Sequence, residues 1–325
     1  MLYARLITMR LMKAIVVLFL IIIFNFFLIH MAPGDPAAIL AGEAGATDKE
    51  FLRQLRERFG LDQPIYVQLW HYVSGIATLD FGYSYRQQMP VLDLILQRLP
   101  ATLLLTGTAF VLSLALGILA GSLAAARVKK VSGSLIMALA LLFYATPLFW
   151  VALMAVVLFS VYLDWLPAYG MYTVGAGLEG FALVLDVAKH LILPATTLAL
   201  FFMAIYTRIT RASMLEASQQ DYVKTARAKG LKDRVIQRRH ILRNALLPII
   251  TLAGLQAGQM VGGAILTETV FAWPGIGRLM YEALMQRDYN LLLGIFFFSA
   301  ALVIVFNIVT DLVYRLADPR IKEAS

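Results

Sequence analysis

The sequence predicts an all-α, polytopic membrane protein: six transmembrane helices, N-in and C-in, with a small extracytoplasmic helical cap between spans 1 and 2. The first observation is composition, since 60% of the 325 residues are apolar and only 15% are charged. A soluble fold could not cover so much apolar surface. The second is six uncharged apolar runs near the roughly 20 residues that cross a bilayer. The third is a one-sided distribution of basic residues.

The six runs cover residues 14–29, 101–126, 135–163, 191–207, 245–266 and 291–310. The first follows three basic residues, so a cleaved signal peptide is the alternative there. The small residues at 44–46 lie too far beyond the run for a cleavage site, which favours an uncleaved span. Pro147 and Pro194 are expected to kink their helices, as a membrane bundle tolerates.

The six runs divide the chain into four segments. We expect an N-terminal transmembrane helix over residues 1–31, an extracytoplasmic helical segment over 32–97, a five-helix membrane domain over 98–314 with an inner loop at 208–244, and a cytoplasmic tail over 315–325. With the N-terminus inside, the inner segments hold 19 Lys and Arg residues and the outer segments hold 9. Acidic residues number 6 inside and 14 outside. The positive-inside rule therefore explains the net charge of +8 without a nucleic-acid partner.

Small residues recur every four positions in two of the runs, where they favour close helix packing in lipid. The second run carries Ala109, Ser113, Gly117, Gly121 and Ala125, and the fifth carries Gly254, Gly258 and Gly262.

The outer segment is too long and polar for a simple loop. Residues 47–50 form a capping box, an apolar stripe follows at 51, 52, 55 and 59, and Gly60 ends the pattern. Pro64 suits the first turn of a second helix. We predict a cap of two short helices packed on the bundle. Two interpretations of this cap are equally supported. It either covers the ends of the helices as a lid or forms a docking surface for a soluble partner.

The inner loop holds ten Lys and Arg residues against three acidic ones. Asp221 is a candidate N-cap, residues 222–229 would form a short helix of about 12 Å, and Gly230 would end it. A short, capped helix on a long loop favours insertion into a groove of a partner. The alternative is that the charges only fix the orientation of the chain in the membrane.

The run EASQQDYVKTARAKG at 216–230, followed by HILRNALLP at 240–248, resembles the EAA loop of permease subunits of bacterial binding-protein-dependent ABC importers. Ser218 stands where the motif usually has a second alanine. Further stretches resemble the dipeptide, oligopeptide and nickel branch: APGDPA (32–37), FGLDQPIYVQLWHY (59–72), LDFGYS (79–84), GAILTETVFAWPGIGRL (263–279) and DPRI (318–321).

The resemblance implies that the inner-loop helix is a coupling helix that docks in a cleft of an ATP-hydrolysing subunit. The residues it marks for coupling are Glu216, Ala217, Asp221, Tyr222, Thr225, Ala226, Arg227, Lys229 and Gly230. It also implies a second homologous permease subunit, two ATP-binding subunits, a periplasmic solute-binding protein and a place in the inner membrane. ATP and magnesium would be bound by the partner ATPases.

The residues themselves indicate that the energy comes from another subunit. No Gly-Lys dipeptide occurs, so the chain has no phosphate-binding P-loop. The six runs contain no Asp, Glu, Lys, Arg or His, which argues against proton coupling. With no cysteine in the chain, thiol chemistry is excluded. We expect no catalysis, no metal site and no cofactor in this chain.

Polar residues in the fifth run are candidates for lining a translocation path. Gln256 and Gln259 share a helix face, and Thr267 and Glu268 lie at the outer end. Hydrogen bonding between helices is an equal alternative for these four. Trp273 is expected to lie in a tight outer turn at the membrane interface.

Other function classes remain open at this point. An ATP-independent channel or secondary carrier would work without any ATPase, and a membrane scaffold would carry no solute. Within the importer reading, peptides are the expected substrate because they are frequent in this branch. Nickel complexes or glutathione are the alternatives, since specificity resides largely in the binding protein.

Overall fold

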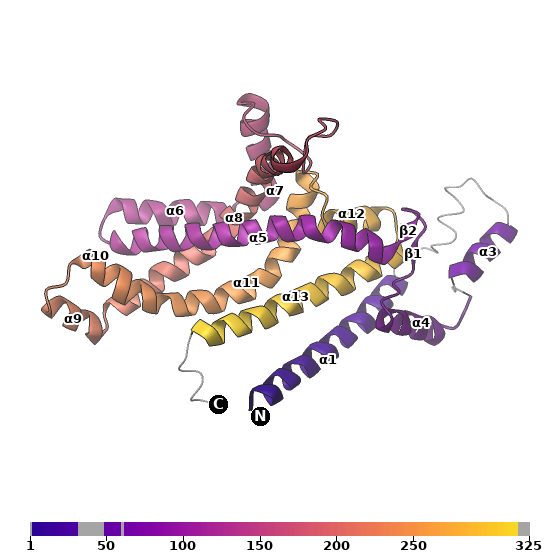
Figure 1. The fold of residues 1–325 in the computed structure, drawn as a ribbon, viewed down its shortest axis with the longest axis horizontal. Coiled ribbons are helices and arrows are strands. Elements are labelled where there is room, and N and C mark those ends of the chain that lie inside the picture. The colour runs from indigo at the N-terminus through magenta and orange to yellow at the C-terminus, as the bar shows by residue number, and fades with distance from the viewer. Residues whose placement is uncertain (1, 32–48, 60–61, 318–325) are drawn as a thin grey trace. The chain divides into compact units, whose positions relative to one another are not determined.

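Helices dominate the computed structural model, which describes residues 2–31, 49–59 and 62–317 (Figure 1). The N-terminal elements are α1 (Leu2–His30), α3 (Lys49–Phe59), α4 (Ile65–Ala77), β1 (Tyr83–Ser84), β2 (Met89–Pro90) and α5 (Val91–Ala126). The middle elements are α6 (Val131–Ala145), α7 (Leu148–Val156), the π-helix η1 (Val157–Tyr162) and α8 (Gly180–Ser218). The remaining elements are α9 (Asp221–Ala228), α10 (Asp233–Val235), the π-helix η2 (Ile236–Leu242), α11 (Arg243–Val270), α12 (Ile276–Met285) and α13 (Tyr289–Ala317).

Four helical segments in the described part are long and apolar enough to cross a membrane: Val91–Ala126, Gly180–Ser218, Asp233–Met260 and Tyr289–Val309. The bent pair α6 and α7–η1 counts as a fifth if it is one span. The first predicted run falls in α1, where Ile15–Leu28 is a shorter apolar stretch. The prediction of a multi-span helical membrane protein is confirmed, and the count of six stays a prediction.

The third predicted span is broken, which corrects the expectation of one kinked helix over 135–163. The two halves, Val131–Ala145 and Leu148–Tyr162, meet at 100°. Thr146 adopts an extended backbone, with φ −82° and ψ 134°. Proline disfavours the helical conformation in the residue that precedes it, and Pro147 has no N–H to continue the ladder. The side chain of Thr146 donates to the Leu142 carbonyl at 2.7 Å, which satisfies one carbonyl of the last turn of α6. By contrast, α8 runs on through Pro194.

The described residues fall into two compact units, and each is described by itself. Unit 1 comprises residues 1–99 and 279–304, and unit 2 comprises residues 100–278 and 305–325.

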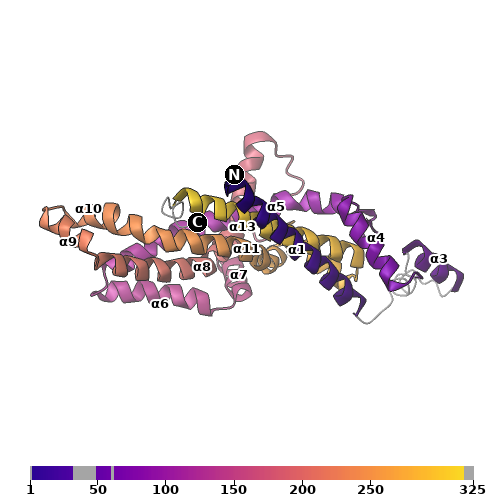
Figure 2. The same ribbon diagram turned by 90° about the horizontal axis from the view of Figure 1, so that it is seen from below.

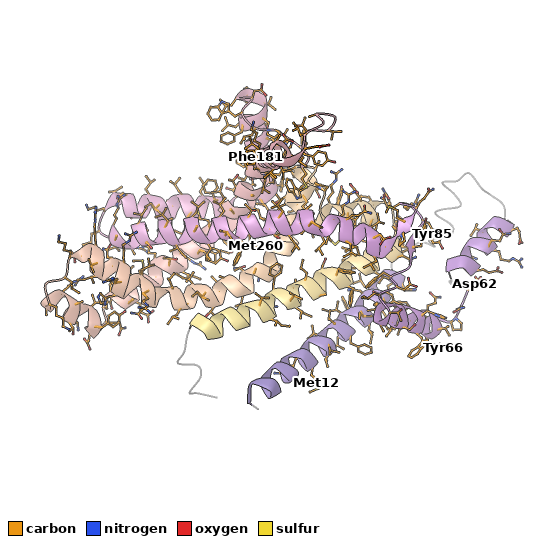
Figure 3. The ribbon with its side chains drawn as sticks, in the orientation of Figure 1. Met12, Asp62, Tyr66, Tyr85, Phe181 and Met260 are labelled. Carbon is orange, nitrogen blue, oxygen red and sulfur yellow. The ribbon has the colours of Figure 1, made fainter. Side chains whose placement is uncertain are left out.

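Within unit 1, α4 packs on α1 through aromatic side chains. The buried ring of Phe26 lies 3.9 Å from the ring of His30 and 5.9 Å from that of Tyr72. The hydroxyl of Tyr72 donates to the Leu293 carbonyl at 3.3 Å, which ties α4 to α13. The other face of α4 is exposed, and Tyr66 projects from it (Figure 3). The predicted second cap helix is therefore present and anchored.

The cap differs from the prediction in two details. Pro64 is the N-cap of α4, and the helix begins at Ile65. The β1–β2 hairpin, paired Tyr83 to Pro90, was not predicted because two-residue strands leave no periodic signal. α3 forms over residues 49–59, whereas Thr47 and Gly60, the expected start and stop, lie outside the described residues.

The hairpin of unit 1 is held to the start of α13. Ser84 donates its hydroxyl to the carboxylate of the buried Asp288, and the Asn290 amide donates to the Tyr83 carbonyl at 3.2 Å. Phe81 packs between Phe297 and Phe298, with ring centroids 5.3 and 5.1 Å away. The segment after α4 is thus fixed on a membrane-spanning helix.

Unit 2 has its core where α5, α8 and α11 meet. Its buried residues come from all three helices and include Leu105, Leu198, Phe202, Tyr206, Ile249 and Met260. Met260 is labelled within the unit in Figure 3. The bend after α6 carries α7 and η1 to a second cluster around Phe271, where Ala152, Val156 and Leu193 are buried. The views of Figures 1 and 2 agree that α9 and α10 lie at one tip of this unit.

The small residues of α5 allow α8 to approach closely, as predicted. A Cβ at Gly117 would overlap Tyr206, and one at Gly121 would lie 2.6 Å from the Thr207 carbonyl oxygen. Gly262, in the second predicted stripe, has nothing within 4 Å of such a Cβ. Close packing is therefore supported on α5 and not at that position of α11.

Candidate functional site

α9 is a short helix that stands between α8 and the π-helix η2. Its N-cap is Gln220, with ψ 152°, and no side chain caps it. The prediction that Asp221 is the N-cap is therefore wrong by one position, since Asp221 is the first helical residue. Its carboxylate accepts from the Lys224 ammonium at 2.8 Å instead. Both side chains are largely exposed, so this ion pair contributes little stability.

The end of α9 is defined by hydrogen bonds around Gly230. Gly230 has φ +75°, its N–H donates to the Arg227 carbonyl at 2.9 Å, and the Leu231 N–H donates to the Ala226 carbonyl at 3.3 Å. This pair of bonds is a Schellman motif, in which glycine supplies the left-handed residue. The predicted stop at Gly230 is confirmed in position and in mechanism.

One face of α9 is packed into its own chain. Val223 is fully buried and Ala226 is 4% exposed. They belong to an apolar cluster, the α9 seat, whose other members are Ala125, Met214, Ala217, Ile236, Ile241 and Ala245. Because these residues come from α5, α8, η2 and α11, the helix is held by the ends of several spans. Sequence reasoning did not select Val223, although its spacing of three from Ala226 marks an apolar face.

The residues of α9 other than Val223 and Ala226 are exposed, as are several residues on either side of the helix. Seven of the nine residues predicted for coupling are exposed: Glu216, Asp221, Tyr222, Thr225, Arg227, Lys229 and Gly230. The other two, Ala217 and Ala226, are buried in the α9 seat. The nine residues therefore divide into a polar surface and a pair that fixes its position.

The four predicted path residues lie in different environments along α11. Gln259 is exposed, whereas Gln256 is 8% exposed, and its Oε1 has no hydrogen-bond partner among the described residues. Thr267 is fully buried, and its hydroxyl is likewise without a partner there. The structure does not bring these side chains together at one point.

Glu268, the fourth predicted path residue, is fully buried near the end of α11. Its Oε1 accepts from the Thr102 hydroxyl at 2.7 Å, and its Oε2 accepts from the Arg278 N–H at 3.0 Å. The carboxylate fills the space beside Gly275, where a Cβ would overlap it. Glu268 thus joins α11, the 273–278 turn and α5 within unit 2.

Trp273 lies in the turn after α11, as predicted, but its side chain is buried in the protein, whereas an interfacial tryptophan was expected. It is fully buried, and its indole N–H donates to the Ala101 carbonyl at 2.8 Å. A buried indole needs such a partner, and the carbonyl comes from a helix 172 residues away in the chain. No local pattern could have revealed this contact.

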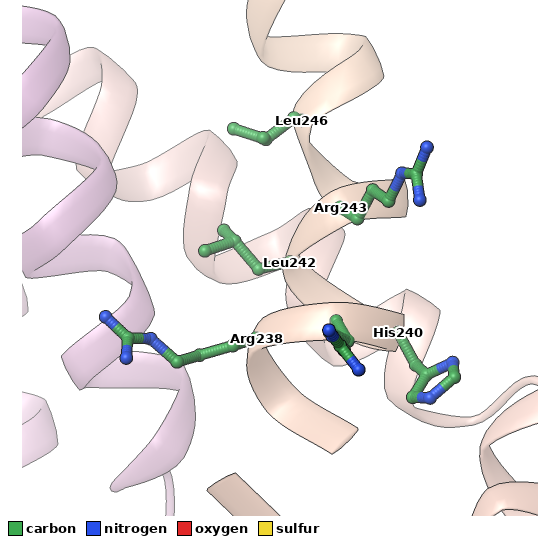
Figure 4. Close-up of a pocket in the computed structure, with 6 residues that line it drawn as sticks. Arg238, His240, Leu242, Arg243 and Leu246 are labelled. Atoms are coloured by element: carbon green, nitrogen blue, oxygen red, sulfur yellow. The ribbon is translucent and has the colours of Figure 1, made fainter. Parts of the chain in front are cut away.

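An open depression of about 610 Å³ lies on η2 and the start of α11 (Figure 4). It is lined by Arg238, Arg239, His240, Leu242, Arg243 and Leu246. For metals, no group of three or more His, Asp or Glu side chains converges within residues 2–31, 49–59 and 62–317.

Comparison with known families gives two matches. Residues 117–323 match the family described as "Binding-protein-dependent transport system inner membrane component", and residues 2–106 match the N-terminal part of such membrane components. Together they span most of both units.

Curated relatives match along nearly the whole chain. The dipeptide transport system permease protein DppB of Alkalihalophilus pseudofirmus is 39% identical over 327 residues, covering 96% of this chain and 98% of its own. DppB of Escherichia coli K12 is 38% identical, covering 93% of this chain and 94% of its own. Among solved structures, an inward-facing MetNI methionine ABC transporter chain aligns with a TM-score of 0.56 at 16% identity, over 70% of this chain and 97% of that one. At that identity the likeness shows the fold alone.

Proposed function

The chain belongs to the inner membrane components of binding-protein-dependent transport systems, and from this premise we propose that it is the permease subunit of an ATP-driven importer of di- or oligopeptides. It is a multi-pass protein of the inner membrane. The peptide substrate follows the relatives at 38–39% identity. Nickel complexes and glutathione are the alternatives within the same machinery, and an ATP-independent channel or carrier is the alternative of another class.

One observation carries the coupling role: α9 is seated by its apolar face and offers its polar face outward. A helix held in this way moves as one body with the ends of α5, α8 and α11, because its contacts reach all of them. Exposed Asp221, Tyr222 and Thr225 then contact the cleft of an ATPase. Ala217 and Ala226 act as positioning residues that transmit the displacement.

The mechanism is mechanical. A periplasmic binding protein delivers the solute to the outer mouth, ATP binding closes two partner ATPases, and their clefts displace α9. The bundle, paired with a second homologous permease, then alternates between outward-open and inward-open forms. This chain performs no covalent step, and ATP with magnesium is bound by the partners.

The orientation completes the proposal. Six spans with both termini inside place the 208–244 loop in the cytoplasm, next to the ATPases, and the cap of α3 and α4 on the outside. Basic residues that outnumber acidic ones on the inner segments support this orientation. Gln256, Gln259, Thr267 and Glu268 are retained as candidates for the path. The burial of Glu268 favours a role in fixing the outer turn over direct contact with solute.

Reconstitution tests the function. The chain is placed in liposomes with its two ATPases, the second permease and the binding protein, and uptake of a labelled dipeptide is measured. Uptake is expected only with hydrolysable ATP and all partners present. Uptake that persists with a non-hydrolysable analogue would refute the importer proposal. Competition by unlabelled peptides, nickel complexes and glutathione separates the substrate alternatives.

A further inference from the structure

The depression on η2 and α11 has basic side chains that the coupling mechanism does not use. Its basic side chains, Arg238, Arg239 and Arg243, are exposed, while Leu242 and Leu246 are half-buried. The volume of about 610 Å³ falls in the range of about 300–1,000 Å³ that small ligands occupy.

The three guanidinium groups, those of Arg238, Arg239 and Arg243, carry positive charges that no carboxylate of residues 2–31, 49–59 and 62–317 pairs with. Arginine stays charged and binds phosphate through two parallel hydrogen bonds, so this surface suits a phosphate group.

One basic and two apolar side chains follow one another along the depression, and they match the charged headgroup and the apolar acyl chain of a phospholipid. Arg238, Leu242 and Leu246 are spaced by four residues and project to one side of the ribbon (Figure 4). The wide turns of η2 keep the first two in line, and α11 continues the line with the third. A charged group is thus followed by two apolar ones as the chain enters the candidate span Asp233–Met260. Arg243 projects from the other side and adds positive potential.

We propose that this depression binds a phosphate group, and that the phosphate belongs to an anionic phospholipid of the cytoplasmic leaflet. The headgroup lies against Arg238, and an acyl chain runs along Leu242 and Leu246. The assignment to that leaflet rests on the proposed orientation of the chain, because basic residues at the cytoplasmic membrane surface attract anionic headgroups. The bound lipid would support the segment that joins α9 to α11.

The test uses the purified complex with its ATPases and second permease. Thermal unfolding is measured in mixed micelles that contain phosphatidylglycerol or phosphatidylcholine, and in detergent micelles with sn-glycerol 3-phosphate dissolved in the buffer. Phosphatidylglycerol is expected to raise Tm, and the other two are not. Replacing the three arginines by glutamine (Arg238→Gln, Arg239→Gln, Arg243→Gln) should weaken this protection by about fivefold in lipid concentration per arginine, which is roughly a hundredfold in all. The single change Leu246→Ser should also weaken the protection by phosphatidylglycerol, although it leaves the charge of the depression unchanged.

A matched control removes three charges elsewhere on the same predicted side, at the exposed Lys129, Lys130 and Lys232, each changed to glutamine. If this control loses protection equally, the arginines contribute only general charge and the proposal is overturned. Equal protection by glycerol 3-phosphate would overturn the lipid assignment and leave a phosphate site. Lost ATPase association in the arginine variant with unchanged lipid protection would assign the surface to a protein partner and refute the proposal.

The lipid measurement is separate from transport. A complex that binds phosphatidylglycerol through these arginines but fails to import peptides would leave the site standing and refute the proposed function. A complex that imports peptides with no lipid preference would do the reverse.

Discussion

Gly230 fixes the end of α9 through its backbone and not through its surroundings. Its φ is +75°, and a Cβ there would meet nothing within 4 Å. A substitution therefore adds conformational strain without a clash, and the strain for a non-glycine residue is about 1–2 kcal/mol.

The loss of transport after a substitution at Gly230 should depend on how readily the new residue adopts the left-handed backbone conformation. We expect Gly230→Asn to keep most transport, since asparagine tolerates this conformation, and Gly230→Val to lose most of it. ATP-dependent peptide uptake in the reconstituted complex measures the effect, with membrane insertion as the control. Equal uptake by the two variants would contradict the assignment of α9 as the coupling helix.

Gly275 is constrained by the opposite cause, lack of space. Its missing Cβ leaves room for the Glu268 carboxylate, which bonds Thr102. Gly275→Ala is expected to lower the free energy of unfolding by about 1–3 kcal/mol, as overpacking does. Gly262→Ala, at a glycine with open space around it, is the control. Similar Tm values for the two variants would show that the carboxylate moves aside freely.

At the scale of elements, α9 depends on its seat. Val223→Asp would bury an unpaired charge in the α9 seat and should detach the helix. Trypsin should then cleave faster after Arg227 and Lys229. Val235→Asp, the same change at an exposed valine of the same loop, should leave cleavage unchanged. Unaltered cleavage in Val223→Asp would mean that the seat does not hold α9.

The start of α13 carries a pH-dependent contact. Burial raises the pKa of Asp288, partly offset by the hydrogen bond from Ser84, the Leu291 N–H and the charge of Arg86. Because the folded-state pKa lies above the unfolded value, the folded state binds this proton more tightly. Asp288 therefore favours the folded state more as pH falls toward the usual pKa of 3.8, and this contribution is lost as pH rises through the raised pKa.

Comparison with Asp288→Asn isolates this group. Asparagine keeps an oxygen that can accept from the Leu291 N–H, at 3.2 Å in the structure, and carries no charge, so the variant should exceed wild-type Tm at neutral pH. The Tm difference between variant and wild type should shrink as the solution is acidified. A difference that stays constant across pH would show that Asp288 does not titrate in the folded protein.

At the scale of the whole molecule, orientation can be tested directly because the chain contains no cysteine. Single replacements at exposed sites, Asp62→Cys and Lys232→Cys, provide unique labels. A membrane-impermeant maleimide should label position 62 in intact spheroplasts and position 232 only after lysis. The reverse pattern would place α9 outside and remove it from any cytoplasmic ATPase.

Local signals in the sequence were enough to predict α9, its glycine stop and the positions of most of the apolar helices. These features depend on residues a few positions apart. The buried Trp273 and the contact between Ser84 and Asp288 depend on partners 172 and 204 residues away, and no spacing rule reaches so far. Pro147 predicted a kink, but the 100° bend also brings α7 against α8 and α11, and the proline alone does not specify these contacts.

The length of α8 gives its contact with α9 a geometric advantage. Its 39 residues form a rod of about 58 Å. If such a rod pivots near its middle, a rotation of about 5° displaces each tip by about 2.5 Å in opposite directions. In the proposed mechanism, a small displacement of the end of α8 beside α9 would therefore produce an opposite displacement at the other end of α8. Bending of α8 would reduce the displacement that reaches that end, so the stiffness of this one helix would limit the coupling.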